Sequence, residues 1–431
     1  MQVQAMPNPA PHLDPDKSQE RAIEMLCQAR ISIITGGPGT GKSTVVRAAL
    51  DMLDSFRGST LPANDNANAT GNGAVELAAP TGKAAKRMQE ATGRSARTLH
   101  RLLEWRGGFE RNAENPLTCE LVVVDEASMI DIELGAALFD AIGEHTRIAL
   151  IGDVNQLPPV GAGRVFADLI DAGEIPVVRL DTLHRQAQQS WVARNAPRVL
   201  TGGPIELDKF DDFELVRAPS AADVMPALRS IVGAHVDAQV LIPQRTGPAG
   251  ITVANNMLQQ VRNTSHQPGD PCMQREDFSI YVGDRVIQTK NDYDLAVFNG
   301  DVGEVVDIKA GAPAVAYGDG AAGERVVQYT NEKAYALQLA YALTVHRSQG
   351  SEFPHVVFVA HSTHTRMLNR QLFYTAITRT RGRVMLVADD RGIEIGLREG
   401  RTPKRNSTLV ERIHGALDAI IDDSAYAVES F

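Results

Sequence analysis

Cysteine is scarce in this chain of 431 residues, which contains only Cys27, Cys119 and Cys272. The three lie far apart and lack the spacing of a metal site, so we expect neither a disulfide framework nor a cysteine-ligated metal. Apolar runs are also short, and none reaches the roughly 18 residues that a membrane span needs. Residues 1–15 are polar and rich in proline, without the apolar segment of a secretory signal. These absences predict a reduced, cytoplasmic protein with no membrane partner.

An excess of positive charge is missing too. The chain carries 43 Lys and Arg against 53 Asp and Glu, a formal net charge of −10. This balance argues against a surface that coats nucleic acid throughout, but it is compatible with a local basic groove. The length and the 43% hydrophobic content are enough for about two to four domains.

A glycine-rich stretch, Gly36-Gly37-Pro38-Gly39-Thr40-Gly41-Lys42-Ser43, fits the P-loop pattern. A short β-branched run precedes it, and an apolar helix pattern follows from Ser43 to Leu53, which favours a P-loop over an ordinary glycine turn. Backbone N–H groups of such a loop close around phosphate oxygens. Lys42 would reach the β- and γ-phosphates of ATP, and the Ser43 hydroxyl would ligate Mg²⁺. We expect nucleotide contacts from Gly37, Pro38, Gly39, Thr40, Gly41, Lys42, Ser43 and Thr44.

Two further strand patterns end in polar residues. The first, at 121–124, is followed by Asp125, which would hold Mg²⁺, and by Glu126, which would orient or deprotonate the attacking water. The second, at 147–151, leads into a turn in which Gln156 would sense the γ-phosphate. Because strand and helix patterns alternate, we expect a parallel sheet with its ligands at the carboxyl ends of the strands.

Basic stretches recur along the chain. Those at 80–88 and 94–101 are suited to a nucleic-acid backbone, because backbone contacts dominate affinity, although a solvated helix face would look the same. Three later stretches, at 183–186, 344–352 and 374–381, lie near strand patterns of a second half. An Arg directed from there at the γ-phosphate would act as an arginine finger. Spacing alone does not separate that role from surface charge.

The second half shows the same alternation, with strand patterns at 177–180, 239–243, 355–360 and 384–388. Between 284 and 340, short β patterns alternate with glycine turns, which predicts a small inserted β-barrel. Residues 104–118 surround Gly107-Gly108 and predict a protruding hairpin. Residues 54–74 have the composition of a surface loop, and 407–421 that of an amphipathic helix with Leu409, Ile413, Leu417 and Ile420 inward.

Taken in order, these motifs resemble those of superfamily 1 helicases, in particular the RecD-type and phage Dda-type branch. The likeness covers about residues 12–395, with Gly36–Thr44 similar to motif I and the segments 79–85, 124–129, 152–161, 344–353 and 374–381 similar to motifs Ia, II, III, V and VI. It implies an α/β fold of two RecA-like parallel-sheet domains, with a small hairpin inserted in the first and an SH3-like β-barrel in the second. The expected boundaries are an N-terminal arm at 1–15, a first domain at 16–178 with its hairpin at 104–118, a second domain at 179–283 and 341–431, and the barrel at 284–340.

The resemblance also implies residue roles. The catalytic residues would be Lys42, Asp125, Glu126, Gln156, Arg185 and Arg379, with Arg379 at the finger position. Gln19 would read the adenine edge, and Glu352 would join the nucleotide site. Contacts with DNA would come from Pro80, Thr81, Lys83, Thr98, His100, Arg101, Thr344, His346 and Ser348. Trp105 and Phe109 would form a pin that separates the strands.

The implied activity is ATP- and Mg²⁺-dependent 5′→3′ movement on single-stranded DNA, with separation of duplex DNA and ATP hydrolysed between the two domains. Its polarity rests on the resemblance alone. The expected partners are single-stranded DNA and single-strand–duplex junctions, with replication or repair proteins as candidates, and the expected state is a monomer. Two alternatives stay open: an RNA-stimulated helicase or ATPase, and a nucleotide-switched remodeller that does not unwind.

Overall fold

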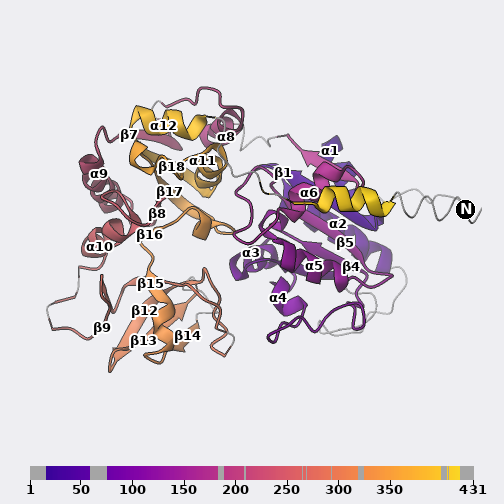
Figure 1. Cartoon of the computed structure of the whole chain (residues 1–431), viewed down its shortest axis with the longest axis horizontal. Helices are drawn as coiled ribbons and strands as arrows, with labels where there is room; N and C mark the ends of the chain where they lie inside the picture. Colours follow the sequence, from indigo (N-terminus) through magenta and orange to yellow (C-terminus); the bar gives the residue numbers. More distant parts are fainter. Residues whose placement is uncertain are drawn as a thin grey trace, which may run out of the picture. The chain divides into compact units, whose positions relative to one another are not determined.

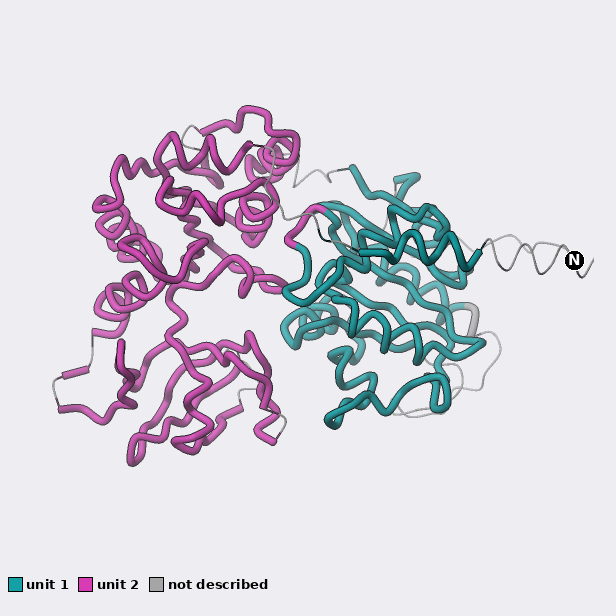
Figure 2. Tube along the Cα trace, viewed as in Figure 1, with its two compact units in different colours: residues 1–154, 158–185, 403–431 teal, residues 155–157, 186–402 magenta. Residues whose placement is uncertain are grey.

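The computed structural model describes residues 16–58, 75–182, 189–207, 210–264, 266–267, 269–292, 294–318, 325–398, 405 and 407–417. The chain forms two compact units, one from residues 1–154, 158–185 and 403–431 and the other from 155–157 and 186–402 (Figures 1 and 2). The expected N-terminal arm and most of the 54–74 loop lie outside the described residues. In the described ranges, we find no helix with the length and hydropathy needed to cross a membrane.

The first unit is built on a parallel sheet, whose strands follow the order β3-β2-β4-β5-β1-β6 (Figure 1). The strands are β1 (Ile31–Gly36), β2 (Val75–Ala79), β3 (Ala96–Thr98), β4 (Leu121–Val124), β5 (Arg147–Gly152) and β6 (Val177–Leu180). All four residues of β4 are buried, as expected of an apolar run inside a parallel sheet. Strand β6 differs from our expectation, because it pairs with β1 in this sheet and not with the second half of the chain.

Helices flank this sheet along the chain: α1 (Lys17–Gln28), α2 (Lys42–Gly58), α3 (Gly82–Thr92), α4 (Leu99–Leu102), α5 (Ile132–Asp140) and α6 (Val165–Ala172). Helix α1 begins with a capping box, in which the Asp16 carboxylate accepts from the N–H groups of Ser18 and Gln19. A last helical stretch, 409–417, packs Leu409 and Ile413 against the core of the first unit. We had assigned this stretch to the second domain. Leu417 ends the described part, and Ile420 lies outside it.

The second unit contains another parallel sheet, with strand order β16-β8-β17-β18-β7. Its strands are β7 (Phe213–Arg217), β8 (Ala238–Leu241), β16 (Ala342–Leu343), β17 (Phe353–Ala360) and β18 (Thr380–Ala388). Its helices are α8 (Trp191–Thr201), α9 (Ala221–Ala234), α10 (Ile251–Arg262), α11 (Arg370–Ile377) and α12 (Asp390–Leu397).

An antiparallel sheet lies within this second unit, between β8 and β16 in sequence, with strand order β14-β13-β12-β11-β15. Its strands are β11 (Arg285–Gln288), β12 (Val302–Lys309), β13 (Ala312–Tyr317), β14 (Arg325–Gln328) and β15 (Leu337–Leu339), and a hairpin of β9 (Cys272–Gln274) and β10 (Ser279–Tyr281) precedes it. A register shift between Val305 and Asp307 marks a bulge in β12, the feature that lets a small sheet bend.

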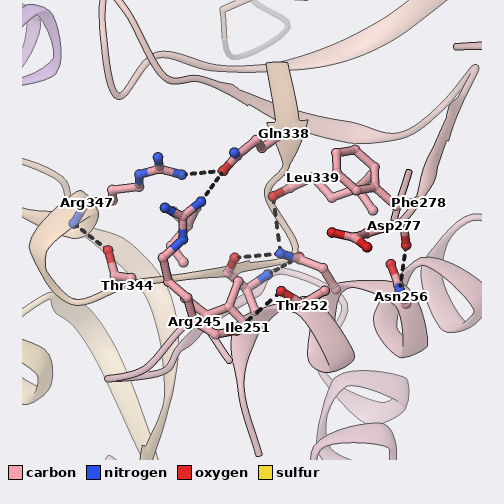
Figure 3. Close-up of a pocket in the computed structure, with 13 residues that line it drawn as sticks. Arg245, Ile251, Thr252, Asn256, Asp277, Phe278, Gln338, Leu339, Thr344 and Arg347 are labelled. Atoms are coloured by element: carbon pink, nitrogen blue, oxygen red, sulfur yellow. Dashed lines mark hydrogen bonds between the residues drawn. The ribbon is translucent and has the colours of Figure 1, made fainter. Parts of the chain in front are cut away.

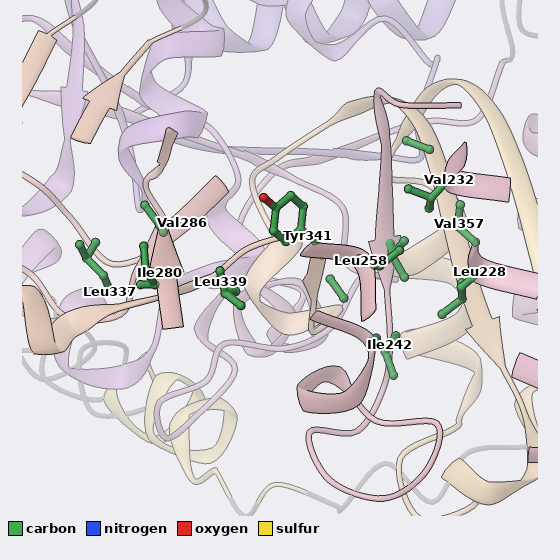
Figure 4. Packing of buried hydrophobic residues seen from close by; sticks show 14 of the residues in the cluster. Leu228, Val232, Ile242, Leu258, Ile280, Val286, Leu337, Leu339, Tyr341 and Val357 are labelled. Atoms are coloured by element: carbon green, nitrogen blue, oxygen red, sulfur yellow. The ribbon is translucent and has the colours of Figure 1, made fainter. Parts of the chain in front are cut away.

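One hydrophobic cluster joins the two sheets of the second unit (Figure 4). Ile242 and Val357 contribute from the parallel sheet, and Val286 and Leu337 from the antiparallel one. Buried polar groups reinforce the joint, because the Asp284 carboxylate accepts hydrogen bonds from Gln259, Asn263 and the Tyr341 hydroxyl. These donors satisfy a carboxylate whose burial would otherwise be costly. The antiparallel sheet is therefore fixed to the parallel sheet of the same unit.

Candidate nucleotide and nucleic-acid sites

Three strands that are neighbours in the first sheet, β4, β5 and β1, carry the predicted nucleotide motifs at their carboxyl ends. The P-loop follows β1, Asp125 and Glu126 follow β4, and the turn containing Gln156 follows β5. All three strands run parallel, so their carboxyl ends meet at one edge of the sheet, where ligands bind in such folds.

The P-loop turns tightly at Gly39 and Gly41, whose φ values of 72° and 84° suit glycine. The Thr40 hydroxyl donates to the Gly37 carbonyl at 2.8 Å. The Lys42 ammonium group folds back over the loop and donates to the carbonyls of Gly36 and Gly37, at 2.6 and 2.9 Å. The loop thus holds a cation at the start of α2, where the helix adds partial positive charge. Both features favour an anionic ligand.

Gln19 braces the P-loop from the neighbouring helix. Its side chain is buried; the amide oxygen accepts from the Asp16 N–H at 3.3 Å, and the amide nitrogen donates to the Thr40 carbonyl at 3.3 Å. The resemblance predicts this side chain at the adenine edge. The Asp-x-x-Gln capping box is the sequence signal that points to the bracing role.

The two acidic residues after β4, Asp125 and Glu126, lie in different environments. The Glu126 N–H donates to Oδ1 of Asp125 at 2.8 Å. Removal from water, followed by the adjacent Glu126 carboxylate, raises the pKa of Asp125 to about 6. Lys42, Ser43 and Asp125 line one small cavity of about 10 Å³. The Asp125 carboxylate is poorly solvated, and it lines the same cavity as the Ser43 hydroxyl. Together the two groups offer oxygen atoms of the kind that Mg²⁺ binds.

Glu126 itself adopts a left-handed backbone conformation, with φ 52° and ψ 37°. For a residue other than glycine this costs roughly 1–2 kcal/mol, and such strain tends to persist where function requires it. The side chain is buried, and Arg87 of α3 lies 3.5 Å from its carboxylate. Sequence reasoning did not single out Arg87, although it falls in the basic stretch at 80–88.

The turn after β5 is buried in part, at Asp153, Gln156 and Leu157. The Val154 N–H donates to the Thr35 hydroxyl at the end of β1, at 3.3 Å, and Gln156 is 7% exposed. Residues 155–157 group with the second unit, where the Leu157 N–H donates to the Thr375 hydroxyl at 2.9 Å. The Leu157 carbonyl accepts from the Gln349 amide, also at 2.9 Å.

The predicted residues of the second unit differ in exposure. Arg379 is buried, and its guanidinium donates to the carbonyls of Thr375 and Ser351 at 3.1 and 3.4 Å. The Glu352 carboxylate accepts from Arg381 at 3.1 Å. Ser348 does not lie where a DNA contact needs it, since it is fully buried and its hydroxyl donates to the Val345 carbonyl. Arg185 lies outside the described residues.

The candidate DNA residues of the first unit cluster around α3 and α4. Thr81 and Thr98 are the N-caps of these helices, and their hydroxyls accept from the N–H groups of Ala84 and Arg101. Pro80 and Lys83 are partly exposed, and Arg101 is exposed. Burial lowers the pKa of His100. Thr344 and His346 of the second unit are also partly exposed.

The predicted hairpin is small, with an isolated antiparallel bridge between Trp105 and Phe109. The tip at 106–108 is exposed, whereas both aromatic side chains are half-buried at its base. The His100 ring lies 6.5 Å from Trp105 and 5.7 Å from Phe109, measured between ring centroids. Phe109 also packs against the core of the unit. The aromatic pair therefore forms a base for the hairpin, and the tip consists of Arg106, Gly107 and Gly108.

Comparison with known proteins gives matches along most of the chain. Residues 14–220 match an AAA domain family, residues 254–317 match the ATP-dependent RecD-like DNA helicase SH3 domain, and residues 339–387 match the UvrD-like helicase C-terminal domain. The chain is 37% identical over 399 residues to the ATP-dependent RecD2 DNA helicase of Deinococcus radiodurans, covering 92% of this chain and 52% of that protein. It is 32% identical over 443 residues to the RecBCD enzyme subunit RecD of Mycolicibacterium smegmatis, covering 93% and 75%.

Solved structures add evidence on the fold. The Pif1 helicase of Candida albicans matches with a TM-score of 0.53 and 18% identity, covering 94% of this chain and 99% of that one. The Bacteroides Pif1 helicase in complex with ADP-AlF3 and single-stranded DNA matches with a TM-score of 0.53 and 16% identity, covering 94% and 97%. Together with the SH3 domain match, these likenesses confirm the expected architecture of RecA-like parallel sheets with an SH3-like insertion.

Proposed function

The chain belongs to the RecD-like family of ATP-dependent DNA helicases, and on this premise we propose that it hydrolyses ATP to move 5′→3′ along single-stranded DNA and to separate duplex DNA. It spans about half the length of the Deinococcus relative and three quarters of the mycobacterial one. We further propose that the chain acts as a monomer, prefers single-strand–duplex junctions and works with replication or repair proteins.

One observation carries the proposal: Lys42, Ser43 and Asp125 are among the residues that line one small cavity. In our account, the loop N–H groups bind the phosphates of ATP, and Lys42 exchanges the carbonyls of Gly36 and Gly37 for phosphate oxygens. Ser43 and Asp125 would hold Mg²⁺, which when bound would offset the charge on the β- and γ-phosphate oxygens.

Glu126 is the base in this proposal. Its carboxylate would orient and deprotonate the attacking water, and Arg87, at 3.5 Å, would hold the carboxylate in place. Gln156 would sense the γ-phosphate, while Arg185 and Arg379 would stabilise the charge that develops on the transferring phosphoryl group. Gln19 would place the adenine while it braces the loop, and Glu352 would complete the nucleotide contacts.

Single-stranded DNA would contact Pro80, Thr81, Lys83, Thr98, His100 and Arg101 in the first unit, and Thr344 and His346 in the second. The burial of Ser348 leads us to give it a different role: its hydroxyl stabilises the turn that presents Thr344 and His346. The hairpin with Trp105 and Phe109 at its base would act as the strand-separating pin.

The direct test of this proposal is ATP hydrolysis measured with and without oligonucleotides. We expect single-stranded DNA to stimulate turnover strongly and RNA of the same sequence to stimulate it little, with Mg²⁺ required for both rates. Stronger stimulation by RNA would favour an RNA-dependent enzyme. Turnover unaffected by either polymer would favour a nucleotide-switched remodeller. Either of these two results would contradict the proposal.

A further inference from the structure

The C-terminal segment belongs to the first unit, although it follows α12 of the second unit in sequence. Residues 403–431 group with the first unit. The helical stretch 409–417, drawn in yellow in Figure 1, packs Leu409 and Ile413 against the hydrophobic core of that unit. Because this stretch is docked, it also sets the place of Arg405, which lies four residues before it.

Arg405 contacts the loop that follows the predicted γ-phosphate sensor. Its guanidinium donates to the backbone carbonyls of Pro159 at 2.6 Å, Gly163 at 2.7 Å and Gly161. All three carbonyls belong to the 158–163 loop, which begins two residues after Gln156. One side chain from the end of the chain is therefore bonded to three points of a loop more than two hundred residues earlier.

The 158–163 loop, Pro158-Pro159-Val160-Gly161-Ala162-Gly163, lies outside the helices and strands of the structure. Its carbonyls are not part of a helix or a sheet ladder, so they need donors from elsewhere. The Ile132 N–H at the start of α5 donates to the Ala162 carbonyl at 2.9 Å. Arg405 serves three more, because a guanidinium holds its N–H donors in a fixed planar fork. The loop thus depends on Arg405 for most of these contacts.

The loop is stiff enough to pass its position on to Gln156. Only Leu157 separates Gln156 from the two prolines, whose rings fix φ. The loop also packs closely on the start of α5, since a Cβ atom at Gly161 would collide with the carboxylate of Asp131. A displacement of the loop would therefore shift the Gln156 backbone, and with it a side chain that is buried.

We propose that Arg405 is a positioning residue of the ATP site, which holds the 158–163 loop and thereby places Gln156 against the γ-phosphate. The inference rests on the proposed function, because Gln156 has this task only if the chain hydrolyses ATP. It makes the C-terminal segment part of the hydrolysis machinery, whereas the sequence gave Arg405 no role. Arg405 bonds the loop and not the nucleotide, so it should affect turnover more than ATP binding.

Arg405→Ala removes the donors to the loop and leaves Gln156 unchanged. We expect kcat for ATP hydrolysis to fall about 10–10²-fold, the order of loss that a small misplacement near the reacting atoms causes, while the KM for ATP stays near the parent value. Arg405→Lys should recover part of this rate, because an ammonium group can still donate to carbonyls. The lysine variant also carries the test if the alanine variant does not fold.

Arg412→Ala is the matched control, because Arg412 is an exposed arginine of the 409–417 helix; its kcat and its thermal unfolding should equal those of the parent. A double-mutant cycle with Gln156→Ala then tests the route of the effect. If Arg405 acts through Gln156, Arg405→Ala should lower kcat little further in the Gln156→Ala protein, since residues that act as a unit are not additive.

Parent-like kcat in both Arg405 variants would overturn this role and leave the proposed function intact. A loss of kcat that only follows a loss of folded protein would overturn it too, by assigning Arg405 to stability. Losses that add in full to those of Gln156→Ala would show that Arg405 does not act through Gln156. If the parent protein does not hydrolyse ATP, the proposed function fails and this role fails with it.

Discussion

The backbone N–H of Glu126 donates a 2.8 Å hydrogen bond to the carboxylate of Asp125. These two consecutive acidic residues at the end of one strand have different surroundings, which suits them to different roles. The left-handed turn at Glu126 separates them. Asp125 is directed to the cavity that it shares with Lys42 and Ser43, and Glu126 lies near Arg87. We therefore expect substitution of Asp125 and substitution of Glu126 to have different effects on ATP binding and hydrolysis.

Glu126→Gln should bind ATP with parent-like affinity and hydrolyse it about 10²–10⁴-fold more slowly, because the amide keeps the shape of the side chain but cannot accept a proton. The backbone strain is the same in both proteins, so thermal stability should change little. Nucleotide binding and single-turnover hydrolysis measure the two effects. Glu133→Gln, an exposed change on α5, is the control. Near-parent hydrolysis in Glu126→Gln would assign the base to another residue.

Arg379→Ala should reduce hydrolysis about 10³-fold or more while ATP binding is largely kept, because a finger acts on charge that develops only in the transition state. The side chain is buried and bonded to two carbonyls, so its removal also risks a loss of stability. Thermal unfolding of the same variant, with the exposed Arg391→Ala as control, separates the two. A fall in stability that matches the fall in kcat would indicate a structural role instead. Arg185→Ala should show the same kinetic pattern.

Acid should destabilise the second unit through His364. Burial is the main cause that lowers the pKa of His364, whose Nε2 lies 3.1 Å from the Ala249 carbonyl. As the pH falls, His364 therefore takes up a proton in the unfolded chain, near pH 6.5, before it does so in the folded chain. The contribution of neutral His364 to folding stability is present above that pH and is lost as the pH falls below it. Thermal unfolding from pH 8 to 5 should show this loss, and His364→Gln should flatten the curve. An identical pH dependence in the variant would remove His364 from the explanation.

Replacing residues 106–116 with a short Gly/Ser linker should leave DNA-stimulated ATP hydrolysis near the parent rate and nearly abolish unwinding. This change removes the exposed tip of the hairpin. The P-loop follows β1, and the acidic pair follows β4, so neither is altered. Phe109 packs on the core, so thermal stability must be followed as well. Ordinary unwinding would contradict the role of a pin. Joint loss of ATP hydrolysis and stability would show that the aromatic base serves the core alone.

The placement of the candidate nucleotide residues could be predicted from the sequence because the motifs that carry them are local. The P-loop, Asp125 and Gln156 each follow a short apolar strand, and parallel strands bring their carboxyl ends to one edge of a sheet. The same reasoning could not tell which sheet Val177–Leu180 joins, because the sequence of a four-residue strand does not identify the neighbouring strand. In the structure this strand pairs with β1 of the first sheet. Helix 409–417 is a similar case, since an amphipathic pattern shows that one face is buried but not against which core.

Side-chain partners were the least predictable feature. Gln19 lies in a motif position, yet its amide also braces Thr40. Ser348 lies two residues from His346, but the short turn directs its hydroxyl inward to Val345. The Arg245 guanidinium donates to the Gln338 side chain (Figure 3), yet the two are 93 residues apart, and no local pattern links them. This last contact depends on how the two sheets of the second unit pack together, which periodicity does not encode.

The central claim is that ATP hydrolysis at the P-loop drives separation of DNA strands with 5′→3′ polarity. Strand displacement on DNA duplexes with a 5′ tail, a 3′ tail or no tail tests it most directly, with Lys42→Ala as the inactive comparison, because loss of the cation leaves the phosphate charge unbalanced in the transition state. We predict ATP-dependent displacement of the 5′-tailed duplex alone, and none with Lys42→Ala. Displacement that favours the 3′ tail, or that persists in Lys42→Ala, would contradict the account.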